Sequence, residues 1–332
     1  MRLSTVVPVS ARGGNLPPMQ TVRLGGRAPL EWPSPAVTIG NFDGVHRGHQ
    51  ALVASTLERA RAVSGTAVVL TFDPHPARLL NPGRAPSALC TPIQKAEMLG
   101  ALGVDRLAVL PFTPELARKG AEEFVREIVV SLLQARAVIV GEGFRFGRGR
   151  EGDLSALRSL GQRLGFEVVA VAPVTHAGAA VSSSRVREAL ARGDVGEARA
   201  LLGRAFWVEG RVVRGEGRGR RLGIPTANLE TENETLPETG VYAGTCRLPS
   251  GEAVPAVVNR GRRPTFGPGA ETLEAHLLGW SGDLYEARVR VGFEARLRDE
   301  RRFADPAALA AQIREDAAHA EAILARLRGN VV

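Results

Sequence analysis

The pattern of predicted secondary structure changes near Gly203, and this change is the sequence feature that most constrains the fold. Upstream of this point, short apolar runs alternate with helical patterns. We assign five runs to strands: AVTIG from Ala36, TAVVLTF from Thr66, RLAVL from Arg106, AVIVG from Ala137 and FEVVAV from Phe166. Strands that alternate with helices over this length predict a parallel sheet covered by helices on both faces.

Downstream of Gly203, turn-rich segments with short strand patterns continue to about Gly292. The candidate strands are FWVEGRVV from Phe206, VYAGTCRL from Val241, AVPAVVN from Ala253, LEAHLL from Leu273 and EARVRVGF from Glu286. Glycine, proline and asparagine turns separate them, which predicts an antiparallel barrel. A final helix, started by Asp305 and Pro306, has one apolar face: Leu309, Ile313, Ala317, Ala320, Ile323, Leu324 and Leu327.

The length of 332 residues exceeds what one hydrophobic core usually spans, so we expect two domains. Residues 36–203 form the first domain and residues 204–332 the second. Residues 1–35 are rich in glycine, proline and arginine without periodicity. We therefore expect an N-terminal lead-in, with order beginning at the strand near Ala36.

The charge of the chain favours anionic partners without choosing among them. A net charge of +8 and a pI near 10.7 attract nucleic acid, membrane surfaces and phosphorylated small molecules alike. The arginines are scattered along the chain, which is the distribution that a genome-wide preference for arginine codons produces. The few tryptophans and tyrosines form no row on which nucleic-acid bases could stack. The two cysteines are far apart, and no segment has the length of a membrane span. We expect a cytoplasmic protein that binds neither nucleic acid nor membranes.

The run TIGNFDGVHRGH, residues 38–49, is the first candidate for a phosphate site. It places a glycine-bearing turn and two histidines between a strand and a helix. Backbone amides and the helix dipole attract anions at such a turn, and His46 and His49 can point imidazoles at the same oxygens. Two alternatives remain open. The histidines are ordinary polar residues at a helix start, or they form a zinc site with His75, without the support of cysteines.

The string GNFDGVHRGH resembles the flavin-specific branch of the HxGH nucleotidylyltransferases, which is the FMN adenylyltransferase module of bacterial bifunctional riboflavin kinase/FAD synthetases. TFDPHP, residues 71–76, and VSSSRVR, residues 181–187, resemble two further motifs of that module. The resemblance implies a Rossmann-like domain in which His46 and His49 steady the ATP phosphates in the transition state. It also implies ATP contacts by Gly40, Asp43, Ser182, Ser183 and Arg187, and flavin contacts by Asp73 and Pro74.

Adenylylation needs no general base, because the FMN phosphate is already ionised and has only to be aligned with the α-phosphorus of ATP. Magnesium on the ATP oxygens supplies part of the charge neutralisation. One departure from the family pattern concerns VGEGFRFG, residues 140–147, where Gly143 stands in place of an Asp or Asn. This departure predicts weaker adenylylation.

A GxGxxG pattern at Gly147, Gly149 and Gly152 matches the dinucleotide-binding fingerprint. It follows the fourth strand of the first domain rather than the first. We interpret it as a turn that accompanies the FRFG motif.

The run GEGRGRRLGIPTANL, residues 215–229, is the phosphate candidate of the second domain. Neither lysine lies in a GxxxxGK[ST] context, which excludes a P-loop. Glycines in the run allow close backbone approach to phosphates, and arginines add charge. The alternative is a flexible basic loop.

PTAN, residues 225–228, resembles the riboflavin kinase module, and GVYAG, NRGRRPTF, TLEAHLL and GDLY follow in that family's order. The resemblance implies that Thr226 and Asn228 hold Mg²⁺ with the ATP phosphates. It implies a catalytic base, Glu274, for the riboflavin 5′-hydroxyl. Further implied contacts are Gly219 and Gly223 to ATP, and Arg263, Pro264 and Thr265 to the flavin. Arg260 replaces a usual apolar residue, which we expect to be tolerated.

Together these motifs predict a bifunctional enzyme that phosphorylates riboflavin to FMN and adenylylates FMN to FAD, with ATP and Mg²⁺. The main alternative is a monofunctional riboflavin kinase whose first domain is impaired by Gly143. There are two further alternatives. One is a nucleotidylyltransferase for another small phosphorylated substrate, with a barrel that has no catalytic role. The other is a nucleic-acid-binding protein. A nucleic-acid-binding protein would have an affinity for nucleic acid that falls steeply as the salt concentration rises.

Overall fold

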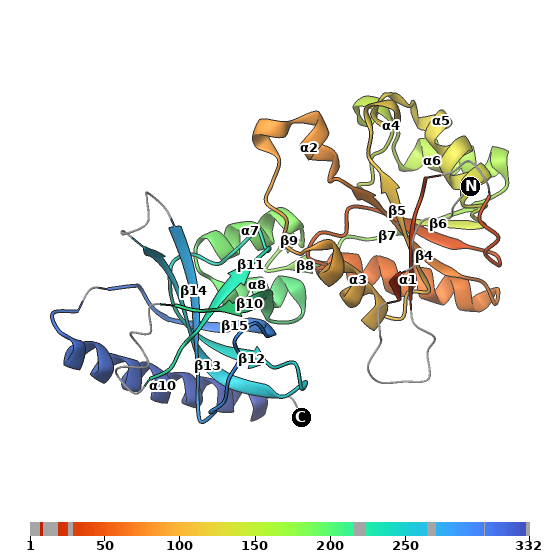
Figure 1. Cartoon of the computed structure of the whole chain (residues 1–332). Helices are drawn as coiled ribbons and strands as arrows, with labels where there is room; N and C mark the ends of the chain where they lie inside the picture. Colours follow the sequence, from red (N-terminus) through yellow and green to blue (C-terminus); the bar gives the residue numbers. More distant parts are fainter. Residues whose placement is uncertain are drawn as a thin grey trace. The chain divides into compact units, whose positions relative to one another are not determined.

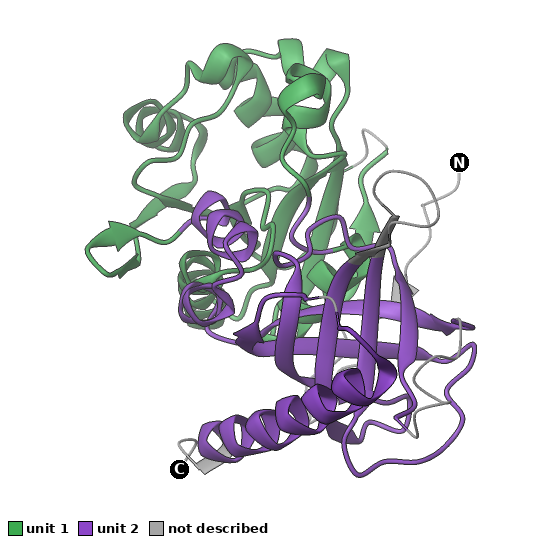
Figure 2. Ribbon diagram, turned by 90° about the vertical axis from the view of Figure 1, so that its left-hand side faces the viewer, with its two compact units in different colours: residues 1–87, 91–181 green, residues 88–90, 182–332 purple. Residues whose placement is uncertain are grey.

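The computed structural model describes residues 7–8, 19–25, 29–215, 224–263, 270–301 and 303–329. The chain forms two compact units, shown in Figure 2: residues 1–87 with 91–181, and residues 88–90 with 182–332. The predicted domain boundary between residues 203 and 204 stays a prediction. By their contacts, the helices α7 (Ser183–Ala191) and α8 (Val195–Leu202) group with the second unit, in which α8 packs on two barrel strands.

The first unit is built on a seven-stranded sheet of order β1-β2-β5-β4-β3-β6-β7 (Figure 1). Every pair from β2 to β7 is parallel. The strands are β1 Val7–Pro8, β2 Gln20–Arg23, β3 Ala36–Ile39, β4 Ala67–Asp73, β5 Arg106–Pro111, β6 Ala137–Gly141 and β7 Glu167–Val171. The main helices are α1 Arg47–Ala62, α2 Pro76–Leu80, α3 Pro92–Ala101, α4 Pro114–Arg118, α5 Ala121–Phe124, the π-helix η2 Val125–Leu132 and α6 Leu154–Leu164. The predicted parallel sheet is confirmed.

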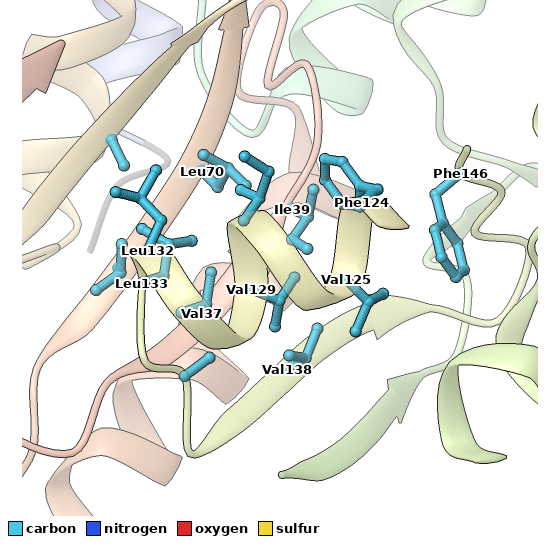
Figure 3. Packing of buried hydrophobic residues seen from close by; sticks show 14 of the residues in the cluster. Val37, Ile39, Leu70, Phe124, Val125, Val129, Leu132, Leu133, Val138 and Phe146 are labelled. Atoms are coloured by element: carbon cyan, nitrogen blue, oxygen red, sulfur yellow. The ribbon is translucent and has the colours of Figure 1, made fainter. Parts of the chain in front are cut away.

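Alternate residues of the strands face opposite layers of helices, as the period of two requires. Val37 and Ile39 pack in one core cluster with Phe124 of α5 and Val129 of η2, as Figure 3 shows. Residues of α6 belong to the same cluster. The other face holds Ala36 and Val69, which pack in clusters with residues of α1 and α3. Both faces of the sheet are therefore covered.

Strand β2 corrects the expectation that order begins near Ala36. Residues Gln20–Arg23 pair in parallel with β5, and Met19 and Leu24 are buried at the two ends of the strand. The strand is short and carries polar residues on a segment rich in glycine and proline. It therefore has no periodicity that marks it in the sequence.

The second unit contains a closed antiparallel barrel of order β10-β11-β14-β13-β12-β15. The strands are β10 Phe206–Val213, β11 Ala227–Thr231, β12 Gly240–Arg247, β13 Ala253–Arg263, β14 Ala270–Leu277 and β15 Arg288–Arg298. The predicted barrel is confirmed, with one strand added. Residues Ala227–Thr231 were assigned to no strand, yet β11 closes the barrel between β10 and β14.

Helix α10, Pro306–Gly329, covers part of the outer surface of the barrel. Asp305 accepts a hydrogen bond from the Ala308 N–H at 2.8 Å and so caps its start. Ala320 and Leu324 of the predicted apolar face are buried against Val241, Ala243 and other barrel residues. No helix within the described ranges is long and apolar enough to cross a membrane.

Candidate active sites

The turn after β3 reverses direction through three residues with left-handed backbone. Phe42, Gly44 and Val45 have φ values of 49°, 76° and 41°. Such values strain residues other than glycine, and strain of this kind concentrates at functional sites. Asp43 and the ring of Phe42 are buried within the turn. Gly40 begins the turn by donating its N–H to the carbonyl of Leu70 at 3.1 Å.

His46 and His49 meet at the start of helix α1. Nδ1 of His46 accepts a hydrogen bond from the His49 N–H at 3.3 Å, so His46 is the N-cap of the helix. The two rings are stacked, with centroids 3.7 Å apart. A Cβ on Gly48 would lie 3.1 Å from Cε1 of His46, so glycine gives this ring its space. The spacing of the motif thus follows from the packing of one imidazole on the other.

The imidazole of His49 is held neutral. Burial, followed by the charges of His46 and Lys95, holds the pKa of His49 well below 6.5. Its Nδ1 atom is buried and has no hydrogen-bond partner among the residues that the structure describes. A buried nitrogen without a partner is costly, and a ligand that supplies one removes the cost.

A network joins the carboxyl ends of β3 and β4. The ammonium of Lys95, on α3, donates to the Asn41 carbonyl at 2.7 Å and to Oγ1 of Thr71 at 3.5 Å. Thr71 in turn donates to the same carbonyl at 3.1 Å. The side-chain amide of Asn41 lies 3.0 Å from Nε2 of His75, the N-cap of α2. His75 therefore supports the turn through its contact with Asn41. A zinc ion bound at Nε2 of His75 would replace this contact.

Asp73 and Pro74 end strand β4, at the same sheet edge as the turn after β3, because the two strands are parallel neighbours. Asp73 forms an ion pair with Arg23 at 2.8 Å, and both side chains remain substantially exposed. Sequence reasoning did not single out Arg23. The carboxyl ends of β3 and β4 thus position six of the predicted residues: Gly40, Asp43, His46, His49, Asp73 and Pro74.

Ser182 and Ser183 lie at the start of α7, and Arg187 lies one turn further along the same helix, which belongs to the second compact unit. The hydroxyl of Ser182 accepts from the Arg185 N–H at 3.3 Å and caps the helix. Helix N-termini of this kind bind phosphate oxygens. The role of these three residues in ATP binding stays a prediction from the resemblance.

Gly143 lies in the turn after β6, and a Cβ placed on it meets no heavy atom within 4 Å. The position is open to a larger residue. The nearby GxGxxG is a tight turn, as interpreted: Phe146 and Gly152 exchange backbone hydrogen bonds of 3.1 and 2.9 Å. Helix α6 begins beyond it, with Asp153 as its N-cap.

The second candidate site is a row of polar residues across three strands of the barrel. Asn228 on β11 lies directly opposite Glu274 on β14, and Glu274 lies opposite Asn259 on β13. Directly opposed residues of antiparallel strands share a face. Val241, the next residue along this row, packs on α10. The row therefore lies on the outer face of the barrel.

The residues at Asn228 fit a magnesium ion by chemistry and by space. Thr226 and Asn228 offer hard oxygen donors, which Mg²⁺ prefers. A Cβ on Gly215 would lie 2.3 Å from Nδ2 and 2.8 Å from Oδ1 of Asn228. The glycine therefore keeps a space over this carboxamide that any other residue would fill.

His276 is a residue of this site that sequence reasoning missed. Its Nδ1 lies 2.9 Å from the carbonyl oxygen of Pro225. A carbonyl only accepts, so Nδ1 donates and carries the proton. His276 thereby ties β14 to the segment that enters β11. Its place two residues after Glu274, on the same face of the strand, is a signal that could have identified it.

Several predicted residues lie outside the described part of the chain. Gly219, Gly223, Pro264 and Thr265 are among them, and Arg263 is described only by its backbone at the end of β13. Their roles stay predictions. Arg260, which replaces an apolar residue, is buried in β13 opposite Gly240 and Leu273.

Comparison with known proteins agrees with the two-part organisation. Residues 29–185 match the family model of FAD synthetase, and residues 202–324 match that of riboflavin kinase. A bifunctional riboflavin kinase/FMN adenylyltransferase from Pseudomonas fluorescens is 44% identical over 289 residues, which cover 87% of this chain and 92% of the relative. The protein of the same name from Escherichia coli K12 is 38% identical over 280 residues, covering 84% and 90%.

A solved structure has the same fold over nearly the whole chain. It is a crystal structure described as a macrolide-efflux protein from Streptococcus pneumoniae, with a TM-score of 0.81 and 29% sequence identity. The match covers 89% of this chain and 97% of that one.

Proposed function

Given that the chain belongs to the family of bifunctional riboflavin kinase/FMN adenylyltransferases, we propose that its two reactions use the two sites described above. The protein phosphorylates riboflavin to FMN and adenylylates FMN to FAD, with ATP as the donor in both steps. The match to both family models favours this function over a kinase with an impaired first domain.

For the kinase step, the observation that carries the proposal is the cross-strand pair of Asn228 and Glu274. Glu274 takes the proton from the riboflavin 5′-hydroxyl as this oxygen attacks the γ-phosphorus of ATP. Asn228, on the neighbouring strand, places the nucleotide phosphates beside that hydroxyl. The reaction then depends mainly on alignment of the two substrates.

Magnesium is the cation that we propose for the kinase site, with Thr226 and Asn228 as its protein ligands. When bound, it neutralises charge on the ATP phosphates. The protein contributes the placement of its ligands: Gly215 leaves the carboxamide of Asn228 accessible, and His276 holds the Pro225 carbonyl next to Thr226.

For the adenylylation step, we place the ATP phosphates at the turn after β3 and the start of α1. A phosphate oxygen of FMN attacks the α-phosphorus, and the bond to the departing pyrophosphate breaks. His46 accepts at Nδ1, so its Nε2 carries the proton in the neutral ring and donates to a phosphate oxygen. His49 completes the pair of imidazoles that lower the barrier by positioning and hydrogen bonding.

The test is the time course of flavin products. Purified protein is incubated with riboflavin, ATP and Mg²⁺, and riboflavin, FMN and FAD are separated by chromatography. FMN should appear first and then convert to FAD. FMN that accumulates without FAD would leave the monofunctional kinase, and no flavin product at all would overturn the proposal.

A further inference from the structure

Lys95 has an unusual position for a positively charged side chain of this protein. The sequence contains only Lys95 and Lys119 as lysines, and all the other positively charged side chains are arginines. Lys119 lies near the surface in ion pairs with Glu123 at 2.6 Å and Glu127 at 2.9 Å. Lys95 is partly buried beneath the turn that follows β3. The two lysines therefore differ in their partners: Lys119 contacts carboxylates, and Lys95 contacts uncharged oxygens.

Within the described part of the chain, Lys95 has no acidic partner for its charge. Its two acceptors, the Asn41 carbonyl and the Thr71 hydroxyl, are uncharged. Among the residues that the structure describes, no carboxylate oxygen lies within 4 Å of its nitrogen. Partly buried charges are normally paired, because desolvation without a counter-charge is costly.

The geometry leaves a donor available at the same place. An ammonium group donates three hydrogen bonds, and two of them are used within the protein. The neighbouring His49 also has capacity for a ligand. The charge of Lys95 helps to lower the pKa of His49, and Nδ1 of His49 has no hydrogen-bond partner in the described ranges of the chain. Among the described residues, a cation without an acidic partner and an imidazole nitrogen without a hydrogen bond thus both lie at the segment from Asn41 to His49.

We propose that the ammonium of Lys95 binds a phosphate oxygen of the adenylylation substrates, ATP or FMN, with its third N–H. The lysine stays protonated throughout, because no proton moves when the FMN oxygen replaces pyrophosphate on the α-phosphorus. Its fixed charge stabilises negative charge on the transferring group. The proposal rests on the placement of adenylylation at the Gly40–His49 turn.

The experiment compares Lys95→Met, which keeps the stem and removes the charge, with Lys119→Met as the matched control. We measure the adenylylation of added FMN, the KM values for ATP and FMN, and inhibition by inorganic pyrophosphate. Lys95→Met should lower kcat/KM for adenylylation by about 100-fold or more, as expected for loss of a phosphate contact. Lys119→Met should match the wild type. Riboflavin phosphorylation by the same chains reports on folding and should not change.

The readouts separate the two sources of phosphate. A weaker inhibition by pyrophosphate, by about tenfold or more, with a raised KM for ATP places Lys95 on the triphosphate. A raised KM for FMN alone places it on the FMN phosphate. Lys95→Arg keeps the charge and should retain binding of the same ligand within a few-fold, which tests the proposal even if Lys95→Met folds poorly.

Two results would overturn the proposal. One is adenylylation by Lys95→Met within twofold of the wild type. The other is a kcat lowered equally in Lys95→Met and Lys95→Arg, with both KM values and pyrophosphate inhibition unchanged. Because Lys95→Arg keeps the charge, this result would limit Lys95 to support of the Asn41 turn. A His49→Gln variant separates a wrong role for Lys95 from a wrong placement of the adenylylation site. If this variant too adenylylates FMN at the wild-type rate, the reaction does not use this turn.

Discussion

Asn228 and Glu274 lie directly opposite each other on neighbouring strands, although 46 positions separate them in the sequence. This register places a carboxamide that suits a metal-bound nucleotide next to a carboxylate that suits proton removal. Register in an antiparallel sheet determines which side chains share a face. The kinase site is therefore as sensitive to the space around these two residues as to their identity.

Gly215→Ala tests this space. The new methyl group would lie 2.3 Å from Nδ2 of Asn228, so the carboxamide must move. We expect the KM for Mg-ATP in riboflavin phosphorylation to rise by about tenfold or more, and adenylylation of added FMN to stay unchanged. Steady-state kinetics of both reactions check this. Gly196→Ala, in helix α8 of the same unit, controls for glycine loss, because its added Cβ would meet only Oδ1 of Asp194 at 3.5 Å. Equal kinase constants for Gly215→Ala and wild type would show that the carboxamide needs no such space.

His276→Ala should weaken Mg-ATP binding at the kinase site. The variant loses the hydrogen bond to the Pro225 carbonyl, and a net loss of about 1 kcal/mol corresponds to roughly a fivefold higher dissociation constant. Calorimetric titration with Mg-ADP measures this. His276→Asn keeps a donor and should recover part of the affinity. The assignment fails if the alanine and asparagine variants bind equally.

Gly143→Asn should be tolerated and should improve adenylylation. No heavy atom lies within 4 Å of the added Cβ, so the free energy of unfolding should change by no more than about 0.5 kcal/mol. An amide restores the polar side chain that the related motif carries, and the KM for FMN or ATP should fall. Gly83→Asn, in the same compact unit and equally open, serves as the control. Slower adenylylation specific to Gly143→Asn would mean that the glycine itself is required.

The stability of the protein should depend on pH through His49. Burial, His46 and Lys95 hold the pKa of His49 well below 6.5 in the folded state. The unfolded chain binds a proton on this residue as the pH falls below about 6.5, while the folded chain does not. The contribution is thus complete above that pH and is lost as the pH falls toward the lower folded pKa. Urea unfolding at about pH 7.5 and about pH 5.5 should show a smaller loss for His49→Gln than for wild type. Parallel losses would contradict the assignment.

Most of the fold could be predicted because its strands are apolar runs bounded by turn residues. AVVLTF and AVIVG are typical of buried parallel strands, and their pattern identifies them without neighbours. The sequence does not mark strand β2 because its polar residues follow no period. It does not mark β11 because ANLET is short and Leu229 is its one large apolar residue. Both are stabilised by pairing with strands distant in sequence.

The site could be predicted only where its residues lie within one motif. His46 and His49 are three positions apart at a helix start, so their proximity follows from local geometry. Lys95 reaches Asn41 across 54 positions, and His276 reaches Pro225 across 51. Contacts of this kind depend on how α3 and β14 pack, which no local pattern in the sequence encodes. The domain boundary stays a prediction, since the compact units divide at Val181 and the riboflavin kinase match begins at residue 202.

The most direct test of two separate sites is a comparison of Glu274→Gln with His49→Gln in both half-reactions. Phosphorylation of riboflavin and adenylylation of added FMN are measured for each variant. Glu274→Gln should lose phosphorylation by at least about 100-fold and keep adenylylation, and His49→Gln should show the reverse. Loss of both reactions in either variant, with folding intact, would contradict the assignment of one reaction to each site.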